Sequence, residues 1–273
     1  MKKRNVALVL AATMMLSLAG CAGSNEKTED TKKAQTETEN KTEGKEDAVQ
    51  IDGALSIYCG AGMQQPFQEI ADAFQEETGC EMNVTYANAA QIQTQIRESQ
   101  EGDFFIAGSK EELKPVEEFV TSSEDLVKHI PVLVVKEGNE KNIQGLNDLA
   151  REDVVTVIGD PESTPIGKIA KKAFADFQIG EKVTIAATTT TAPQLATVVG
   201  LGEADAAIIW KENAKADGVE ICDTTDLDAY VKVIPAARLS FNENVDAADA
   251  FTEFLGTEEA HNIWESYGYE LVK

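Results

Sequence analysis

The sequence predicts an α/β protein of two lobes, each a mostly parallel sheet flanked by helices, with the chain crossing between the lobes twice. Three observations predict this class. Short strand-like apolar segments alternate with amphipathic helical segments, and turns of small residues follow the strands. A valine-rich strand at 131–136 separates two such series, and a strand at 230–235 returns the chain to the first series. Open sheets of this kind bind ligands at the carboxyl ends of their strands.

Residues 1–20 have the features of an export signal. Lys2, Lys3 and Arg4 precede an apolar segment, 6–16, that is too short to span a bilayer with margin. The sequence LAGC, which ends at Cys21, resembles the bacterial lipobox, and this resemblance implies that Cys21 becomes the lipid-bearing N-terminus. The alternative is an ordinary signal peptide with a chance cysteine.

Residues 21–50 contain the lipidated cysteine and then almost no large apolar side chain. Such a segment cannot bury enough surface to offset its chain entropy, so we expect a disordered tether. The folded part then begins near residue 51. We expect the first lobe to comprise 51–130 and 230–273, the second lobe to comprise 131–229, and the two crossovers to form a hinge.

The charge of the chain excludes some partners. It has 24 basic and 48 acidic side chains, a net charge of −24, which disfavours binding to nucleic acid. A small anion can still be held by local main-chain dipoles. Cys59, Cys80 and Cys222 have no CxxC spacing, so the sequence predicts neither a metal site nor a disulfide framework. The two histidines, His129 and His261, lack a recognisable catalytic partner, so we expect solvated or structural roles for them.

The elements of the first series are short and regularly spaced. The apolar face Phe67, Ile70 and Phe74 predicts a helix, and Asn88 is a good N-cap for the next helix. The expected elements are strands at 54–59, 82–86 and 103–107, and helices at 66–77 and after residue 88.

The second series has the same alternation. The expected elements are strands at 131–136, 154–159, 183–187 and 206–210, and helices at 146–150, 165–177 and 193–200. A return strand at 230–235 and two closing helices, 247–255 and 258–267, complete the chain.

From Leu55 to Tyr269 the chain resembles the molybdate-binding proteins of ABC transporters. The similar segments, in order, are LSIYCGAGMQQPFQEIADAFQEETG (55–79), GDFFIAGS (102–109), 132–149, 157–174, GEADAAIIW (202–210) and 247–271. The resemblance implies the type II periplasmic binding protein fold, a tetrahedral oxyanion as ligand and delivery to a membrane permease. We also expect a monomer that is not an enzyme and has no cofactor, and the lipobox resemblance implies that it is anchored by lipid at the outer face of the cell membrane.

In such a site, free main-chain N–H groups at helix starts hold the anion, and the helix dipoles add positive potential. No lysine or arginine is required. The positions that match are on four helix starts and at one strand end: Ala61, Gly62, Met63, Asn88, Ala89, Pro165, Ile166, Thr191, Ala192 and Trp210. An ordinary turn between strand and helix is the alternative for each start taken alone.

The sequence departs from the family pattern at the ligand positions. Gly62 replaces a serine, Asn88 and Ala89 replace a pair of serines, and Trp210 replaces a tyrosine. The site is therefore poorer in hydroxyl groups and bulkier, which leaves molybdate, tungstate and other oxyanions open. Thr188–Thr191 offers four hydroxyl groups that either compensate or form a polar loop.

Other functions have different signatures. A binding protein of the same fold for a small organic solute would pack Met63 and Trp210 against its ligand. A secreted hydrolase would require a nucleophile or metal motif, and neither GxSxG nor HExxH is present. A passive surface lipoprotein would show no ligand-dependent closure.

Overall fold

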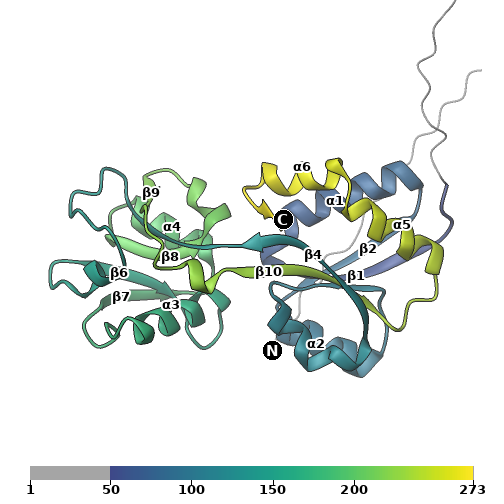
Figure 1. Cartoon of the computed structure of the whole chain (residues 1–273), viewed down its shortest axis with the longest axis horizontal. Coiled ribbons are helices and arrows are strands. Elements are labelled where there is room, and N and C mark those ends of the chain that lie inside the picture. Colours follow the sequence, from purple (N-terminus) through teal and green to yellow (C-terminus); the bar gives the residue numbers. More distant parts are fainter. Residues whose placement is uncertain (1–49, 273) are drawn as a thin grey trace, which may run out of the picture. The chain divides into compact units, whose positions relative to one another are not determined.

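The computed structural model describes residues 50–272, which belong to one compact unit, Glu46–Lys273 (Figure 1). The expected signal segment 1–20, the lipidation site Cys21 and nearly all of the tether 21–50 lie outside the described residues. Two separate sheets organise the described part. Their strands come from 54–129 with 232–271 and from 131–221, respectively.

The first sheet has six strands in the order β11-β4-β10-β3-β1-β2. One side of the sheet is a βαβαβ unit in which β1 is parallel to both β2 and β3. The elements of this unit are β1 (Ala54–Gly60), a 3₁₀ turn (Ala61–Met63), α1 (Gln64–Thr78), β2 (Glu81–Ala87), α2 (Ala89–Ser99) and β3 (Phe104–Ile106). The other elements are a 3₁₀ segment (Lys110–Phe119), β4 (Val120–His129), β10 (Lys232–Leu239), α5 (Val245–Leu255), α6 (Glu258–Ser266) and β11 (Glu270–Leu271).

The second sheet has five strands in the order β7-β6-β8-β5-β9. Here β6 pairs in parallel with both β7 and β8, and β8 is the middle strand of the sheet. The strands are β5 (Pro131–Lys136), β6 (Val155–Gly159), β7 (Thr184–Thr189), β8 (Ala206–Trp210) and β9 (Val219–Ile221). The helices are α3 (Pro165–Asp176) and α4 (Ala192–Gly200), with 3₁₀ turns at Leu146–Ala150, Lys211–Lys215 and Asp228–Tyr230.

The two sheets are mixed, which corrects the expectation of mostly parallel sheets. β10 runs antiparallel to β3 and β4, β11 runs antiparallel to β4, and β5 runs antiparallel to β8 and β9. The antiparallel strands β4, β5 and β10 are the ones that carry the chain between the sheets (Figure 1). A strand that leaves one sheet and a strand that returns to it run in opposite directions, so the crossovers themselves add antiparallel pairs.

Each crossover is short. β4 ends at His129 and β5 begins at Pro131, so Ile130 alone separates a strand of the first sheet from a strand of the second. On the return, Tyr230 ends a turn beside the second sheet and β10 begins at Lys232. The fold is therefore two-lobed, with two hinge segments.

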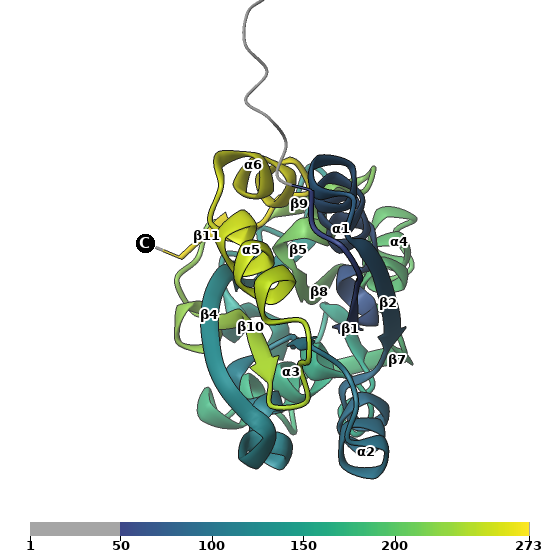
Figure 2. The ribbon, with the colours of Figure 1, turned by 90° about the vertical axis from the view of Figure 1, so that its right-hand side faces the viewer.

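Separate apolar cores support the two lobes. In the first lobe the ring of Phe251 on α5 packs edge-on against Phe74 and Phe104, with centroids 5.1 Å and 5.2 Å apart. Leu55, Ile57 and Cys59 of β1 point into this core, which α1, α5 and α6 cover, whereas Tyr58 points to the opposite face, where α2 packs (Figure 2). This alternation is the period of two expected for a strand between two layers.

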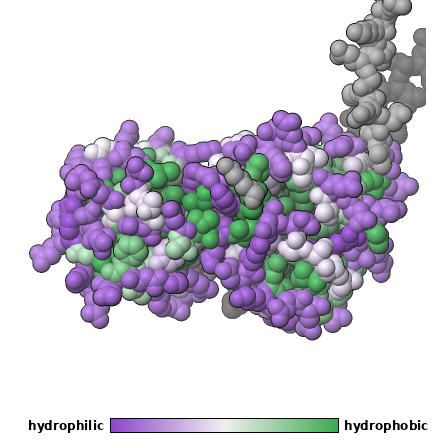
Figure 3. All heavy atoms as spheres, in the orientation of Figure 1, coloured by the Kyte–Doolittle hydropathy of each residue, from purple (hydrophilic) through white to green (hydrophobic). Residues whose placement is uncertain are grey.

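The core of the second lobe is built around β6 and β8. Residues of β8, from Ala206 to Ile209, are fully buried between α3 and α4. Polar side chains cover most of the face of the molecule seen in Figure 3, in keeping with a chain of which 26% is charged. Among residues 50–272, none of the helices combines the length and the apolar character that a bilayer crossing requires.

Candidate ligand-binding site

The four helix starts predicted from the sequence follow strand ends that are paired with each other. Gly60 at the end of β1 is in register with Ala87 at the end of β2, and Gly159 at the end of β6 is in register with Thr189 at the end of β7. Since neighbouring strands lie about 4.8 Å apart, each lobe brings two helix starts to the same edge of its sheet.

The turn before α1 leaves its main chain accessible. Ala61 and Gly62 are exposed, and a Cβ atom at Gly62 would meet no other described atom within 4 Å. Within residues 50–272, neither Gly60 nor Met63, which precede the turn and α1, supplies a capping side chain. Met63 as a whole residue is only 2% exposed, and its side chain packs in the core of the first lobe.

Asn88 is the N-cap of α2, as predicted. Its Oδ1 accepts the Gln91 N–H at 3.0 Å, and its Nδ2 donates to Gln91 Oε1 at 2.6 Å. The side-chain amide is therefore engaged with the helix itself. The following main-chain N–H groups, of Ala89 and Ala90, belong to the first turn, which has no intrahelical acceptors for them.

The start of α3 depends on a residue that the sequence analysis did not select. Thr164 is the N-cap, and its Oγ1 accepts the Gly167 N–H at 3.0 Å. Pro165 occupies the first turn, where its missing N–H is no loss, and Ile166 is buried. A Cβ at Gly167 would lie 2.3 Å from the Gly159 carbonyl oxygen, so only glycine lets the helix approach the end of β6 this closely.

The start of α4 is polar and exposed. Thr191 precedes the helix without a side-chain capping bond among the described residues, and Ala192 is buried. The Thr189 hydroxyl donates to the Thr191 carbonyl oxygen at 3.0 Å. One of the four threonine hydroxyls is thus used within the turn.

The first turns of these helices differ from those of the other α-helices. α1, α2, α3 and α4 have no acidic residue in the first turn, although the chain contains 48. α5 begins with Asp246 and α6 with Glu258 and Glu259, the usual arrangement for a helix dipole. The positive ends of α1 to α4 are therefore left without a neutralising carboxylate from their own first turns.

Trp210 lies at the junction of the lobes. It ends β8, pairs with Pro131 at the start of β5, and is 8% exposed. Its indole stacks on the His129 imidazole, with centroids 3.5 Å apart and an interplanar angle of 20°. The Lys211 N–H donates to the Ile130 carbonyl oxygen at 2.9 Å, so the end of β8 is tied to the first crossover.

Charged residues surround this stack. His129 Nε2 lies 3.0 Å from Glu212 Oε1, and both side chains are nearly buried. On the far side, His129 Nδ1 lies 3.3 Å from the Gly108 carbonyl oxygen. The Gly108 N–H donates to Glu112 Oε2 at 2.8 Å. This cluster was missed from the sequence because its members lie on four different segments with no local motif.

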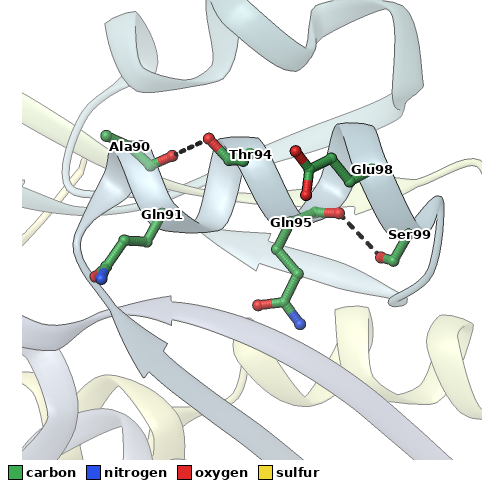
Figure 4. Close-up of a pocket in the computed structure, with 6 residues that line it drawn as sticks. All are labelled: Ala90, Gln91, Thr94, Gln95, Glu98 and Ser99. Atoms are coloured by element: carbon green, nitrogen blue, oxygen red, sulfur yellow. Dashed lines mark hydrogen bonds between the residues drawn. The ribbon is translucent and has the colours of Figure 1, made fainter.

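Two surface hollows lie away from the helix starts of the second lobe. One, of about 490 Å³, lies along the exposed side of α2 (Figure 4) and is lined by Ala90, Gln91, Thr94, Gln95, Glu98 and Ser99. Its hydroxyls are engaged with the helix, since Thr94 donates to the Ala90 carbonyl at 2.9 Å and Ser99 to the Gln95 carbonyl at 3.0 Å. The other, of about 460 Å³, lies between α1 and α6. Neither includes Trp210 or the predicted residues of α3 and α4.

Within residues 50–272, no group of three or more histidine, cysteine, aspartate or glutamate side chains is placed to hold a metal ion. The thiols of Cys59, Cys80 and Cys222 are free and buried. Burial raises the pKa of each of these thiols, which suits structural rather than reactive cysteines.

The fold consists of two mixed sheets that are joined by two short crossovers, and helices start at the strand ends of each sheet. This arrangement defines a two-lobed binding protein of the type II periplasmic class. The family model for the bacterial extracellular solute-binding proteins matches residues 55–270. The chain therefore belongs to this family, whose members bind solutes and are not enzymes.

Curated relatives agree with this assignment. The chain is 23% identical to the "Putative ABC transporter substrate-binding lipoprotein YvgL" of Bacillus subtilis, over 98% of this chain and 99% of the relative. It is also 23% identical to the molybdate-binding protein ModA of Escherichia coli, over 82% of this chain and 91% of the relative.

Solved structures share the fold and differ in ligand. The substrate-binding domain of a "putative molybdenum ABC transporter" from Clostridium difficile has a TM-score of 0.70 and 24% identity, over 81% of this chain and 100% of that one. The sulfate-binding protein SubI of Mycobacterium tuberculosis has a TM-score of 0.64 at 16% identity, covering 81% and 88%. Iron-bound HitA of Pseudomonas aeruginosa has a TM-score of 0.64 at 17% identity, covering 81% and 86%.

Proposed function

We propose that this protein binds molybdate, or a similar tetrahedral oxyanion such as tungstate, between its two lobes and delivers it to the permease of an ABC importer. It acts as a carrier and not as an enzyme. Lipid on Cys21 anchors it at the outer face of the cell membrane, and 21–50 serves as the tether. Relatives that are named as a molybdate-binding protein and as a transporter lipoprotein support this proposal.

The observation that best supports an oxyanion as the ligand is the absence of acidic residues from the first turns of α1 to α4. In a chain with a net charge of −24, four helix starts at paired strand ends with no carboxylate in their own first turns are a specific feature. The nearest carboxylate before α3, Asp160, accepts the N–H groups of Glu162 and Ser163. Free N–H groups and an unneutralised dipole are what an anion requires. The helices α5 and α6, which are not part of the proposed site, do have acidic residues in their first turns.

The donors in this proposal are mainly main-chain groups. Ala61, Gly62 and Met63 contribute from the first turn, and Ala89 from the second. In the second lobe the donors are Ile166, Thr191 and Ala192, and Pro165 fixes the first turn without donating. Trp210 closes the site beside the hinge, where its indole N–H can donate but not accept.

The test is calorimetric titration of the purified protein with molybdate, tungstate, sulfate and a panel of small organic acids. We expect saturable 1:1 binding of molybdate or tungstate. Binding of an organic acid alone, with no response to any oxyanion, would replace the oxyanion by the organic-solute function.

A matched pair of variants locates the site. Gly62 has open space around its Cβ position and a φ outside the left-handed region, so both Gly62→Asp and Gly62→Asn fold. Gly62→Asp places a carboxylate at the start of α1 and lowers oxyanion affinity by at least about tenfold, because like charges repel there. Gly62→Asn keeps the size without the charge and retains most of the affinity. Equal affinities for the two variants would remove α1 from the site.

A further inference from the structure

The Glu112 carboxylate accepts a hydrogen bond from a main-chain N–H group just after a strand end. β3 ends at Ile106, and two residues later the Gly108 N–H donates to Glu112 Oε2 at 2.8 Å. This donor is of the same kind as those assigned to the ligand at the other strand ends. The carbonyl oxygen of the same residue, Gly108, lies in the next peptide group and is 3.3 Å from His129 Nδ1.

Glu112 lies close to the turn before α1. A Cβ atom at Gly60 would be 3.9 Å from the Gly108 nitrogen, so the peptide that Glu112 holds borders the turn Ala61–Met63. The carboxylate is thus bonded to a main-chain group that lies beside Gly60, the residue before the proposed donors of the first lobe.

The surroundings of the Glu112 carboxyl shift its pKa. Burial is the largest influence and raises the pKa above its usual value, whereas the hydrogen bond from the Gly108 N–H and the charges of His129 and Lys168 act to lower it. Lys168 belongs to α3 of the second lobe. A half-buried carboxylate therefore lies at a first-lobe strand end and is influenced by a charge of the second lobe.

We propose that Glu112 couples capture of the oxyanion to the uptake of one proton. In the empty protein Glu112 is a carboxylate on the Gly108 N–H, and in the complex it is a neutral carboxylic acid. The proton comes from solvent and adds to a carboxylate oxygen, and no bond of the oxyanion changes. This inference rests on the proposed function.

The physical reason is repulsion between like charges at low dielectric. A dianion held on the main-chain donors beside Gly60 adds negative charge next to a carboxylate that is already partly removed from water. Both effects disfavour the charged form of Glu112. The complex then binds more protons than the empty protein does, so the affinity rises as the pH falls towards the Glu112 pKa.

The other charged groups near Glu112 are each accounted for. Glu111, on the same segment, is exposed and paired with Lys232, whose Nζ lies 2.7 Å from Glu111 Oε1. His129, on β4, is paired with Glu212. His129 is the other ionisable side chain that contacts Gly108, and it therefore has its own variant.

The experiment is calorimetric titration with sodium molybdate and sodium tungstate at about pH 6 and about pH 8, in two buffers of different ionisation enthalpy at each pH. Neither anion carries a proton in this range, so any proton taken up belongs to the protein. We expect roughly fivefold or greater tightening at the lower pH, with net uptake of up to one proton. Glu112→Gln binds about tenfold more tightly than the native protein at the higher pH, and its affinity is the same at both pH values within about twofold.

Glu111→Gln is the matched control, since it removes the same charge one residue away. It keeps the native pH dependence. The inference is overturned if oxyanions bind with equal affinity at both pH values, if Glu111→Gln and Glu112→Gln behave alike, or if the pH dependence persists in Glu112→Gln and disappears in His129→Gln. Absence of binding in every variant at every pH would instead contradict the proposed function itself, and this inference with it.

Discussion

The Trp210 indole lies flat on the His129 imidazole, with ring centroids 3.5 Å apart and planes 20° apart. His129 ends the last strand of the first sheet before the crossover, and Trp210 ends the central strand β8 of the second sheet. The stack therefore joins the two lobes at the hinge. Trp210 is predicted from the sequence to contact the ligand, and its aromatic face has a second contact, with His129.

Replacing Trp210 tests both roles. Trp210→Ala removes a side chain that is 8% exposed, so we expect a loss of about 3 kcal/mol in the free energy of unfolding, together with weaker ligand binding. Trp210→Phe keeps a ring on His129 and loses the indole N–H. Denaturant unfolding and calorimetry separate the effects. Native affinity in Trp210→Phe would show that the N–H does not contact the ligand.

Asn88→Asp separates stability from binding at α2. Aspartate is as good an N-cap as asparagine and complements the helix dipole, so the melting temperature should stay the same or rise slightly. The new carboxylate at the proposed anion site should lower oxyanion affinity about tenfold or more. Asn88→Ser, which keeps a neutral cap, is the control. Unchanged affinity in Asn88→Asp would place the ligand away from α2.

Two glycines at helix starts should differ in how much stability the protein loses when each is replaced by alanine. Gly167→Ala brings a Cβ within 2.3 Å of the Gly159 carbonyl oxygen, so we expect destabilisation of about 3 kcal/mol or failure to accumulate as folded protein. Gly62→Ala meets open space and should change the unfolding free energy by less than about 1 kcal/mol. Thermal denaturation of both variants, followed by circular dichroism, checks this. Similar melting temperatures would contradict the packing at the end of β6.

Cys21→Ser tests the anchor. If Cys21 carries lipid, the native protein fractionates with membranes, and the variant accumulates as an unprocessed precursor or in the soluble exported fraction. Fractionation of expressing cells, with metabolic labelling by a radioactive fatty acid, is the measurement. Equal labelling of the native protein and the variant would show that the lipobox resemblance is incidental.

The alternating strands and helices could be predicted because their patterns are local. The apolar face of α1 and the cap of α2 at Asn88 both appear as expected. β4 was missed because its first half, Thr121–Asp125, is exposed and polar and is fixed by pairing with β10, more than 100 residues away. β9 and β11 are too short to show a period.

In the candidate site, too, the local features could be predicted from the sequence and the long-range contacts could not. The helix starts follow from turns of small residues, whereas Thr164 was overlooked beside Pro165, although a threonine before a helical proline is a recognisable cap signal. Glu112 and His129 could not be connected from the sequence. Both contact Gly108, Glu112 through its N–H and His129 through its carbonyl oxygen, and this contact depends on the tertiary fold.

Main-chain N–H groups from helix starts of both lobes are proposed to hold one oxyanion. Anomalous diffraction from crystals grown with tungstate locates the ligand, because tungsten marks its position. We expect one strong peak between the lobes, with the tungstate oxygens within hydrogen-bonding distance of main-chain nitrogens in Ala61–Met63 and at the start of α3 or α4. A peak bound only by side chains outside these turns, or no peak in crystals of protein that is fully folded, would contradict it.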